Sequence, residues 1–432
     1  MSPKSRGASK LFDLLYLALA ALLLPYFLYR RFKGKKSAPW REKMGWAPER
    51  KTGVRRLWIH AVSVGEATAA EPLVKALKAA LPDADIVIST TTVTGHAVAE
   101  KRYGAENVVF YPHDFSWTVR RFLDRIKPSI VVLMELEVWP NMTAEAVARG
   151  IPVLVVNGRI TERSAKRYKL GWRLVSGAFL RATRWLVQTD EYAARLKNLG
   201  VDPTRIEVAG NIKYDAVDTA PPDPAQRIAL RRELGIDENA PVLIGGSTHP
   251  TEETALLGAY KKLCAGTCPG LRLILVPRHP ERFNGVEAEI KAAGETCARR
   301  SATHAPNLAA PVILVDTMGE LKRMYAAADV AFVGGSLIPH GGQNVMEPCG
   351  MGVPVCHGPH MHNFNEAMEI LHACKGSVEL SSSDLAPALE GLFANRDDAL
   401  AMAARAREAF LKKQGATARA VETIRELAFK DK

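Results

Sequence analysis

The chain has 432 residues, 47% of them hydrophobic, and its 58 Lys and Arg against 46 Asp and Glu leave a net charge of +12. This length and composition are those of a globular protein with two domains, which excludes a small disulfide-stabilised scaffold. The excess of positive charge favours an acidic partner, such as phosphate, anionic lipid or nucleic acid. The six cysteines are scattered over the second half without a zinc-binding spacing, so we expect reduced thiols in a cytosolic environment.

The N-terminal segment, residues 1–38, contains an apolar stretch, Leu11–Tyr29, whose only charged residue is Asp13. At about 1.5 Å per residue this stretch reaches roughly 28 Å, close to the hydrocarbon thickness of a bilayer. Basic residues follow it and no small-residue cleavage site does, so the pattern predicts a retained membrane anchor with the rest of the chain in the cytoplasm. The alternative is an apolar helix packed on the soluble body.

Residues 39–212 alternate short apolar runs with helical patterns, which predicts a doubly wound, Rossmann-like α/β domain. A helix is expected over Ala67–Leu81, after the first strand. The expected parallel strands are Leu57–Val62, Asp85–Ser89, Val108–Tyr111, Ile130–Met134, Val153–Val156 and Trp185–Gln188. Polar loops directly follow these strands, and in such domains the loops at the carboxyl ends of the strands form the site.

A proline-rich linker over 213–240 precedes a second Rossmann-like domain over 241–405. Its expected strands are Val242–Gly245, Leu271–Val276, Val312–Val315, Val330–Val333 and Val353–Cys356. The tail, 406–432, is predicted to be helical and could pack back on the first domain. Two α/β domains that face each other across a cleft form the GT-B architecture, which is typical of nucleotide-sugar transferases.

A glycine-rich loop follows the strand Val330–Val333, and Asn344 is a good N-cap for a helix after that loop. A strand, a glycine-rich loop and a helix N-terminus together let backbone N–H groups approach an anion. Glu347, in the first turn of the expected helix, could accept both hydroxyls of a ribose. The alternative is an ordinary glycine-rich connection without a ligand.

Eleven short motifs occur in order along nearly the whole chain. They are WIHAVSVGE (58–66), TTTVTG (90–95), MELEVWPN (134–141), NGRITERS (157–164), GNIKYD (210–215), GSTHPTEE (246–253), LILVPRHPERF (273–283), DTMGEL (316–321), FVGGSL (332–337), GGQNVMEP (341–348) and GPHMHNF (358–364). With these motifs the chain resembles the 3-deoxy-D-manno-oct-2-ulosonic acid (Kdo) transferases of lipid A assembly, glycosyltransferase family 30. Its sequence departs from the family where Gln343 replaces a more usual histidine.

The resemblance implies a GT-B enzyme anchored to the inner membrane, with its catalytic domains facing the cytoplasm. The family uses neither a metal nor a cofactor. It moves Kdo from CMP-Kdo to the glucosamine disaccharide of a lipid A precursor, lipid IVA, inverts the anomeric centre and releases CMP, in lipopolysaccharide core biosynthesis. Two other classes are a nucleotide-sugar epimerase of the same fold, which would need no anchor, and a non-catalytic nucleotide-sugar binder.

A CMP-sugar presents a single phosphate, which the guanidinium of Arg278 could bind with two hydrogen bonds. The alternative for Arg278 is a surface ion pair with Glu281. The resemblance places the donor site at Gly246, Ser247, Arg278, His279, Met318, Gly319, Glu320, Asn344 and Glu347.

An inverting transfer needs a base that takes the proton of the acceptor hydroxyl. Glu66 matches the glutamate proposed as the base in the family, and the dipole of the following helix would keep it ionised. The alternative is that Glu66 only caps that helix. We expect Glu135 to orient substrate and donate or accept hydrogen bonds. If the strand continues, Glu137, two residues further, would lie on the same face as Glu135. The two carboxylates could then bind a metal, which the family does not need.

Residues 155–186 contain eight Lys or Arg against a single Glu, with Trp172, Phe179 and Trp185 interleaved. Nucleic acid is one possible partner. The apolar N-terminal stretch and the lack of an RNA-binding motif favour anionic lipid headgroups and acceptor phosphates instead. The residues expected to face acceptor and lipid are Ser63, Arg159, Arg163, Lys166 and Arg167.

Overall fold

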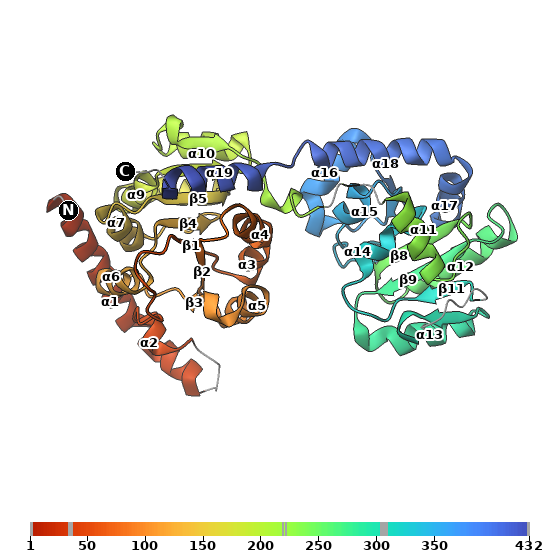
Figure 1. The fold of residues 1–432 in the computed structure, drawn as a ribbon, viewed down its shortest axis with the longest axis horizontal. Helices are drawn as coiled ribbons and strands as arrows, with labels where there is room; N and C mark the ends of the chain where they lie inside the picture. The colour runs from red at the N-terminus through yellow and green to blue at the C-terminus, as the bar shows by residue number, and fades with distance from the viewer. Residues whose placement is uncertain (1–2, 33–37, 218–219, 221–222, 303–309, 430–432) are drawn as a thin grey trace. The chain divides into compact units, whose positions relative to one another are not determined.

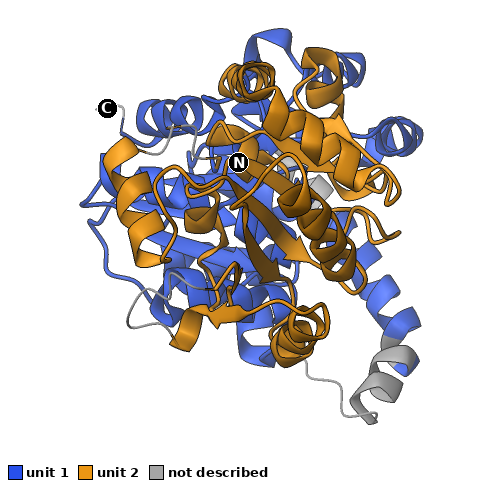
Figure 2. Ribbon diagram, turned by 90° about the vertical axis from the view of Figure 1, so that its right-hand side faces the viewer, with its two compact units in different colours: residues 1–216, 413–432 blue, residues 217–412 orange. Residues whose placement is uncertain are grey.

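The computed structural model describes residues 3–32, 38–217, 220, 223–302 and 310–429, except for the side chains of residues 3–9, 24 and 26–32. It contains two compact units (Figure 2). Unit 1 consists of Met1–Ala216 and Lys413–Lys432, and unit 2 consists of Val217–Lys412. The expected basic flank at Lys33, Lys35 and Lys36 lies outside the described residues, as does most of the proline-rich stretch 219–222.

Unit 1 is built on a seven-stranded parallel sheet with the order β3-β2-β1-β4-β5-β6-β7. Its strands are β1 (Arg56–His60), β2 (Asp85–Thr90), β3 (Val108–Phe110), β4 (Ile130–Met134), β5 (Val153–Gly158), β6 (Arg184–Val187) and β7 (Ile206–Val208). Successive side chains of β1 enter opposite faces of the sheet, with Trp58 in one buried cluster and Leu57 and Ile59 in the other. Both faces are therefore covered, as expected for a doubly wound domain.

The helix α2 (Trp40–Lys43) precedes the first strand, and further helices connect the strands (Figure 1). The connecting helices are α3 (Val64–Ala69), α4 (Glu71–Ala80), α5 (Val93–Tyr103), α6 (Ser116–Ile126), α7 (Pro140–Ala148), α8 (Glu162–Leu170), α9 (Trp172–Arg181) and α10 (Asp190–Asn198). The prediction of a single helix over Ala67–Leu81 is wrong, because the structure has two helices there, α3 and α4. Pro72 lies at the start of α4, where its missing N–H costs nothing, and it favours a new helix at that point.

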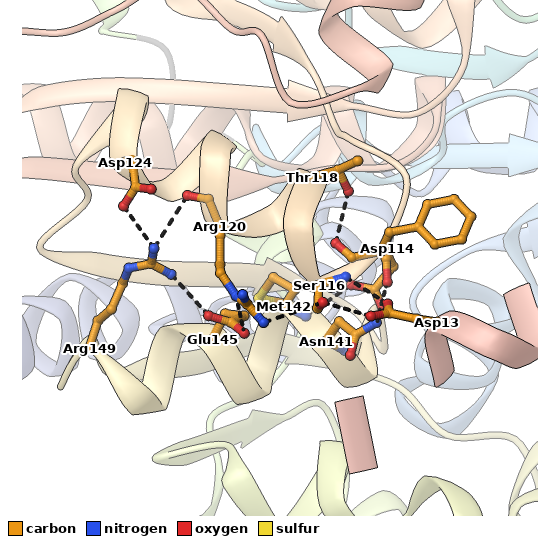
Figure 3. Close-up of polar contacts among 11 residues, drawn as sticks. Asp13, Asp114, Ser116, Thr118, Arg120, Asp124, Asn141, Met142, Glu145 and Arg149 are labelled. Carbon is orange, nitrogen blue, oxygen red and sulfur yellow. Dashed lines mark hydrogen bonds and ion pairs between the residues drawn. The ribbon is translucent and has the colours of Figure 1, made fainter. Parts of the chain in front are cut away.

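The first helix, α1 (Pro3–Phe32), includes the expected span Leu11–Tyr29 and packs against α6 and α7. Asp13 is buried there: it accepts hydrogen bonds from the backbone N–H of Ser116 (2.8 Å), the hydroxyl of Ser116 (2.6 Å) and the side chain of Asn141 (3.1 Å) (Figure 3). The one charge of the apolar stretch thus faces the protein. No helix among the described residues is long and apolar enough to cross a membrane.

Unit 2 has a second seven-stranded parallel sheet, with the order β10-β11-β9-β8-β12-β13-β14. Its strands are β8 (Val242–Thr248), β9 (Arg272–Pro277), β10 (Cys297–Arg299), β11 (Val312–Leu314), β12 (Val330–Val333), β13 (Val355–His357) and β14 (Val378–Glu379). Its helices are α11 (Pro224–Glu233), α12 (Glu252–Ala265), α13 (Phe283–Ala292), α14 (Leu321–Tyr325), α15 (Met346–Gly350), α16 (Asn365–Cys374), α17 (Leu385–Ala394) and α18 (Arg396–Leu411). The two parallel sheets confirm the α/β class and the pair of Rossmann-like domains.

Two segments differ from the predicted division of the chain. The stretch 213–240 contains α11, which belongs to unit 2 through the contacts of Arg231 with Asp329 (2.8 Å) and with the carbonyl of Ala327 (3.0 Å). The tail is shared: α18 packs on unit 2, whereas α19 (Ala416–Phe429) packs on the unit 1 sheet. The chain changes unit between Lys412 and Lys413, after α18 has ended.

Candidate active site

In unit 1, Glu66 lies just beyond the carboxyl end of β1. Its carboxylate accepts hydrogen bonds from the backbone N–H of Val62 (2.9 Å) and from the hydroxyl of Ser63 (3.2 Å). Ser63 is the N-cap of α3, and its hydroxyl accepts in turn from the N–H of Glu66 (3.3 Å). This reciprocal arrangement is similar to a capping box, with the N–H of Val62 in place of that of the N-cap Ser63, so the capping role weighed as an alternative is present. It also fixes the carboxylate in one place.

The pKa of Glu66 is raised to about 7, first by burial and further by the charges of Glu135 and Glu137. The expectation that the dipole of α3 would keep Glu66 fully ionised was therefore wrong. A helix of six residues contributes little against the loss of hydration and two neighbouring carboxylates. A carboxylate with a pKa near the working pH is a stronger base than an ordinary glutamate.

Glu135 and Glu137 follow β4, the strand next to β1 in the sheet. Burial raises the pKa of both, and the charge of Arg159, which follows β5, opposes this for Glu135. Glu135 has a left-handed backbone, with φ of 58°, which is strained for a residue other than glycine. The charges of the three glutamates affect one another's pKa values at the carboxyl ends of the neighbouring strands β1 and β4. Within the described ranges, no three His, Cys, Asp or Glu side chains are arranged to hold a metal ion.

Lys43, which no sequence motif singled out, joins the ends of two further strands of unit 1. Its ammonium donates hydrogen bonds to the carbonyls of Thr91 (3.2 Å) after β2 and Tyr111 (3.1 Å) after β3. Burial lowers the pKa of Lys43 to about 8. The lysine comes from the short helix α2, before the first strand, so only the folded chain reveals this placement.

The basic segment of unit 1 is carried by the loop after β5 and by α8 and α9. Arg159, Arg163, Lys166 and Arg167 are exposed, although Lys166 forms an ion pair with Glu162 (2.7 Å). The interleaved aromatic residues point inward instead: Phe179 and Trp185 are buried, with stacked rings 5.7 Å apart. They therefore form core rather than a surface on which bases could stack. Ser63 does not belong to this basic surface, because it caps α3 beside Glu66.

In unit 2, every predicted donor residue lies at or beyond the carboxyl end of a parallel strand. Gly246 and Ser247 are among the last three residues of β8. Arg278 and His279 follow β9, Met318 to Glu320 follow β11, and Asn344 and Glu347 follow the loop after β12. Because these four strands are adjacent and parallel, the residues gather at one edge of the sheet.

The backbone at the end of β8 is tightly enclosed. Ser247 has a left-handed backbone, with φ of 53°, at an irregularity in the pairing of β8 with β9. A Cβ atom added to Gly246 would lie 2.1 Å from the hydroxyl of Tyr325, and one added to Gly334 would lie 2.3 Å from the carbonyl oxygen of Ser247. A side chain at Gly246 would displace the buried Tyr325 of α14, and one at Gly334 would displace the backbone of Ser247.

Arg278 is exposed, and its backbone N–H donates to the carbonyl of Thr248 (3.0 Å). The ion pair with Glu281 weighed as its alternative role is not found among the described residues. Glu281 instead faces the Nδ1 of His279 at 3.7 Å. The guanidinium of Arg278 thus has no carboxylate partner in the described part of the chain.

His249 lies at the centre of a group of polar rings that the sequence did not bring together. Its ring centroid is 4.2 Å from that of His340 and 5.4 Å from that of His279, and its Nε2 is 3.1 Å from the Nε2 of Gln343. Burial lowers the pKa of His249 to about 4, and the charges of His340 and His279 contribute. His249 is therefore neutral at pH 7 and offers hydrogen bonds rather than positive charge.

Asn344 and Glu347 contact each other at the start of α15. The side-chain amide of Asn344 donates to the carboxylate of Glu347 (3.0 Å), and its oxygen accepts from the N–H of Met346 (3.1 Å). Burial raises the pKa of Glu347, and the charge of Lys322 opposes this shift. The helix expected near Asn344 is therefore present, but it begins at Met346 and is short.

One expectation for the glycine-rich loop of unit 2 needs correction. The backbone N–H groups of Gly335, Ser336 and Leu337, expected to approach an anion, already donate to the buried carboxylate of Glu252. Glu320 is occupied by Arg300, at 3.2 Å, and by the hydroxyl of Thr317. The loop between β11 and α14 keeps Met318 exposed. The role of Glu320 in the donor site stays a prediction.

Comparisons with known proteins agree over most of the chain. A family model described as 3-deoxy-D-manno-octulosonic-acid transferase (kdotransferase) matches residues 38–216. The 3-deoxy-D-manno-octulosonic acid transferase of Haemophilus influenzae is 34% identical over 85% of this chain and 86% of that protein. The protein of the same name from Bordetella pertussis is 38% identical over 77% of this chain and 78% of its own length.

Solved structures are similar in fold. A glycosyltransferase from Rickettsia africae has a TM-score of 0.52 at 14% identity, covering 88% of this chain and all of its own. A UDP-GlcNAc 2-epimerase from Neisseria meningitidis has a TM-score of 0.51 at 12% identity, covering 87% of this chain and all of its own. The C-terminal CMP-Kdo binding domain of WaaA from Acinetobacter baumannii is 30% identical, with a TM-score of 0.40, and covers 43% of this chain and 96% of that domain.

Proposed function

The chain belongs to the 3-deoxy-D-manno-octulosonic acid transferase family, and we propose that it transfers Kdo from CMP-Kdo to a lipid A precursor and releases CMP. The observation that carries the proposal is the 34% identity to the Haemophilus influenzae transferase over 85% of the chain. The acceptor we propose is the glucosamine disaccharide of lipid IVA, within lipopolysaccharide biosynthesis.

We place the donor on the edge of the unit 2 sheet where β8, β9, β11 and β12 end. Arg278 would bind the single phosphate of CMP through its guanidinium, which has no carboxylate partner in the described chain. Asn344 and Glu347, already in contact with each other, would bind the ribose hydroxyls. The exposed Met318 and the adjacent Gly319 would line the base.

We assign the base of an inverting, metal-independent transfer to Glu66. The acceptor hydroxyl attacks the anomeric carbon of Kdo from the face opposite to CMP, and its proton passes to the carboxylate of Glu66 as the new bond forms. The bond from that carbon to the phosphate oxygen breaks with both electrons on CMP. The raised pKa of Glu66 supports this role. Glu135, whose carboxylate the charge of Arg159 favours, would orient the acceptor.

We propose that unit 1 rests on the cytoplasmic face of the inner membrane. Asp13 ties α1 to the body of unit 1, and the leucines on its free side remain exposed, including Leu14 (65%) and Leu22 (76%). These leucines would lie in the interface, while Arg163 and Arg167 of α8 would attract anionic headgroups. This position would bring the enzyme to an acceptor that stays in the bilayer.

Release of CMP tests the reaction and separates it from the two alternatives. The full-length protein should release CMP from CMP-Kdo only when a lipid A precursor in detergent or vesicles is added. An epimerase of this fold would instead interconvert a nucleotide sugar without any acceptor, and a pure binder would release nothing. Release of CMP at the same rate without acceptor would contradict the proposed transfer.

A further inference from the structure

Glu252 is a fully buried carboxylate in the first turn of α12, and the proposed reaction does not use it. Its Oε2 accepts hydrogen bonds from the backbone N–H of His249 (2.9 Å) and of Gly335 (2.7 Å). Its Oε1 accepts from the backbone N–H of Ser336 and of Leu337, both at 3.0 Å. One side chain thus satisfies backbone donors from the loop after β8 and from the glycine-rich loop after β12.

The turn held by Glu252 supports the next part of the same loop. The N–H of Gly342 donates to the carbonyl of Gly335 (2.8 Å), and the N–H of Gln343 donates to that of Gly334 (3.0 Å). Gln343 precedes Asn344, the residue assigned to the ribose, and its side chain contacts His249. The carboxylate therefore sets the position of His249 directly and that of Asn344 through two backbone hydrogen bonds.

The carboxyl group of Glu252 stands where a bound anion would otherwise sit: burial raises its pKa, and the hydrogen bonds from the four loop amides oppose this shift. Several converging backbone N–H groups form the kind of concave site that elsewhere binds a phosphate. Without an acceptor, these buried donors would each lose the hydrogen bond that water supplies in the unfolded chain. Because Glu252 occupies them, the glycine-rich loop holds one conformation before any ligand arrives, and the phosphate of the donor is left to other groups.

We propose that Glu252 is a positioning residue for the CMP-sugar donor, which presets the two loops that carry His249 and Asn344. The inference rests on the proposed function, because it takes the edge of the unit 2 sheet as the donor site. Glu252 touches no substrate itself. Because Glu252 orders these loops before CMP binds, the free energy of CMP binding is not reduced by the entropy lost on ordering them.

The neighbouring Glu253 provides a matched control. It is also fully buried in the first turn of α12, but its carboxylate binds the guanidinium of Arg282 (2.6 and 3.2 Å) instead of loop amides. Substitution of Glu253 by Gln removes the same charge from the same helical turn and leaves the loop donors in place. An effect specific to the loops must therefore appear in E252Q and not in E253Q.

The test compares the full-length wild type, E252Q and E253Q by calorimetric titration with CMP, by steady-state kinetics and by hydrogen exchange. Glutamine keeps one acceptor oxygen and points an NH₂ group at backbone donors. We expect E252Q to bind CMP about 10- to 100-fold more weakly and to raise the KM for CMP-Kdo, with the KM for the acceptor unchanged. The amides of Gly335, Ser336 and Leu337 should exchange faster in E252Q only.

The outcomes separate this inference from the proposed function. If E252Q binds CMP as tightly as the wild type, or if E253Q weakens CMP equally, Glu252 does not position the donor. If the wild type itself fails to bind CMP, the proposed function fails and this inference fails with it. Should E252Q not fold, E252D replaces it: its carboxylate is one methylene too short to reach both loops, so the same losses are expected, and wild-type CMP affinity in E252D would overturn the inference.

Discussion

The substitution Glu66→Gln separates the two roles that the structure allows for this residue. A glutamine side chain can still accept from the N–H of Val62 and pair with Ser63, so the capping box is nearly preserved. It cannot accept a proton. Loss of activity with the fold intact would therefore show that Glu66 acts as the base. Unchanged activity would show that Glu66 only caps α3.

The raised pKa of Glu66 also predicts a change in stability. The folded pKa of about 7 lies above the ordinary value of 4.5, so the folded protein favours the protonated form. Stability from this group is fully present below pH 4.5 and is lost as the pH rises through about 7. Glutamine removes the charge that causes the loss. Glu66→Gln should therefore raise the free energy of unfolding by roughly 1–3 kcal/mol at pH 8, and should change it little at pH 4.

Both effects are measurable on the same samples. Wild-type turnover should rise about tenfold per pH unit below pH 7 and level off above it, as Glu66 loses its proton. Glu66→Gln should lower kcat about 10²- to 10⁴-fold at pH 8, with CMP binding unchanged. Ser63→Ala is the control: it removes the cap, costs about 0.5–2 kcal/mol of stability and keeps the base.

Near-wild-type turnover by Glu66→Gln, with Kdo still appearing on the lipid, would remove Glu66 from the mechanism. A variant that is no more stable than the wild type at pH 8 would show that Glu66 is not held in an unfavourable charged state. A wild-type rate that does not change between pH 5 and pH 8 would contradict the assigned pKa of about 7.

Three further predictions concern the donor, α1 and the membrane. Arg278→Ala should weaken the use of CMP-Kdo by about 2–4 kcal/mol in kcat/KM, and Arg278→Lys should recover only part, because a lysine cannot form two parallel hydrogen bonds. Asp13→Ala should lower the free energy of unfolding by about 1–3 kcal/mol and speed proteolysis near α1, because the N–H and hydroxyl of Ser116 lose a buried acceptor. Charge reversal of Arg163 and Arg167 to Glu should weaken binding to anionic vesicles, and added salt should reduce wild-type binding in the same way.

Each of these predictions has a contradicting result. Unchanged kinetics of Arg278→Ala would place that residue outside the donor site. A stable and protease-resistant Asp13→Ala protein would show that the buried hydrogen bonds do not hold α1. Vesicle binding that depends neither on salt nor on anionic lipid would show that Arg163 and Arg167 do not contribute to the membrane contact. Leu14→Ser serves as a surface control for α1, since this side chain is exposed and should not affect unfolding.

The central strands could be predicted from the sequence because a parallel strand covered on both faces needs a continuous apolar run. The strands that were missed lack such a run: β7 is Ile-Glu-Val, β10 is Cys-Ala-Arg and β14 is Val-Glu. Each lies at an edge of its sheet, where fewer of its side chains need to be apolar. The break between α3 and α4 was visible in principle, because Pro72 favours a helix start.

The candidate site was predictable in its location but not in its electrostatics. The rule that loops at strand ends form the site located the loops of Glu66, Arg278 and Asn344. The shift in the pKa of Glu66 was predicted with the wrong sign, because the burial of its carboxyl group and the effect of the charges of Glu135 and Glu137 arise only in the folded sheet. Glu252 binds an amide 83 residues away in the chain, which no local pattern could indicate.

The appearance of Kdo on the lipid is the most direct measurement of the proposed activity. Purified full-length protein is incubated with CMP-Kdo and lipid IVA, without added metal, and the lipid is analysed by mass spectrometry. We predict a lipid heavier by one or more Kdo residues, formed only when donor and acceptor are both present and absent with Glu66→Gln. Consumption of CMP-Kdo with the lipid unmodified, or an equal yield from Glu66→Gln, would contradict the proposal.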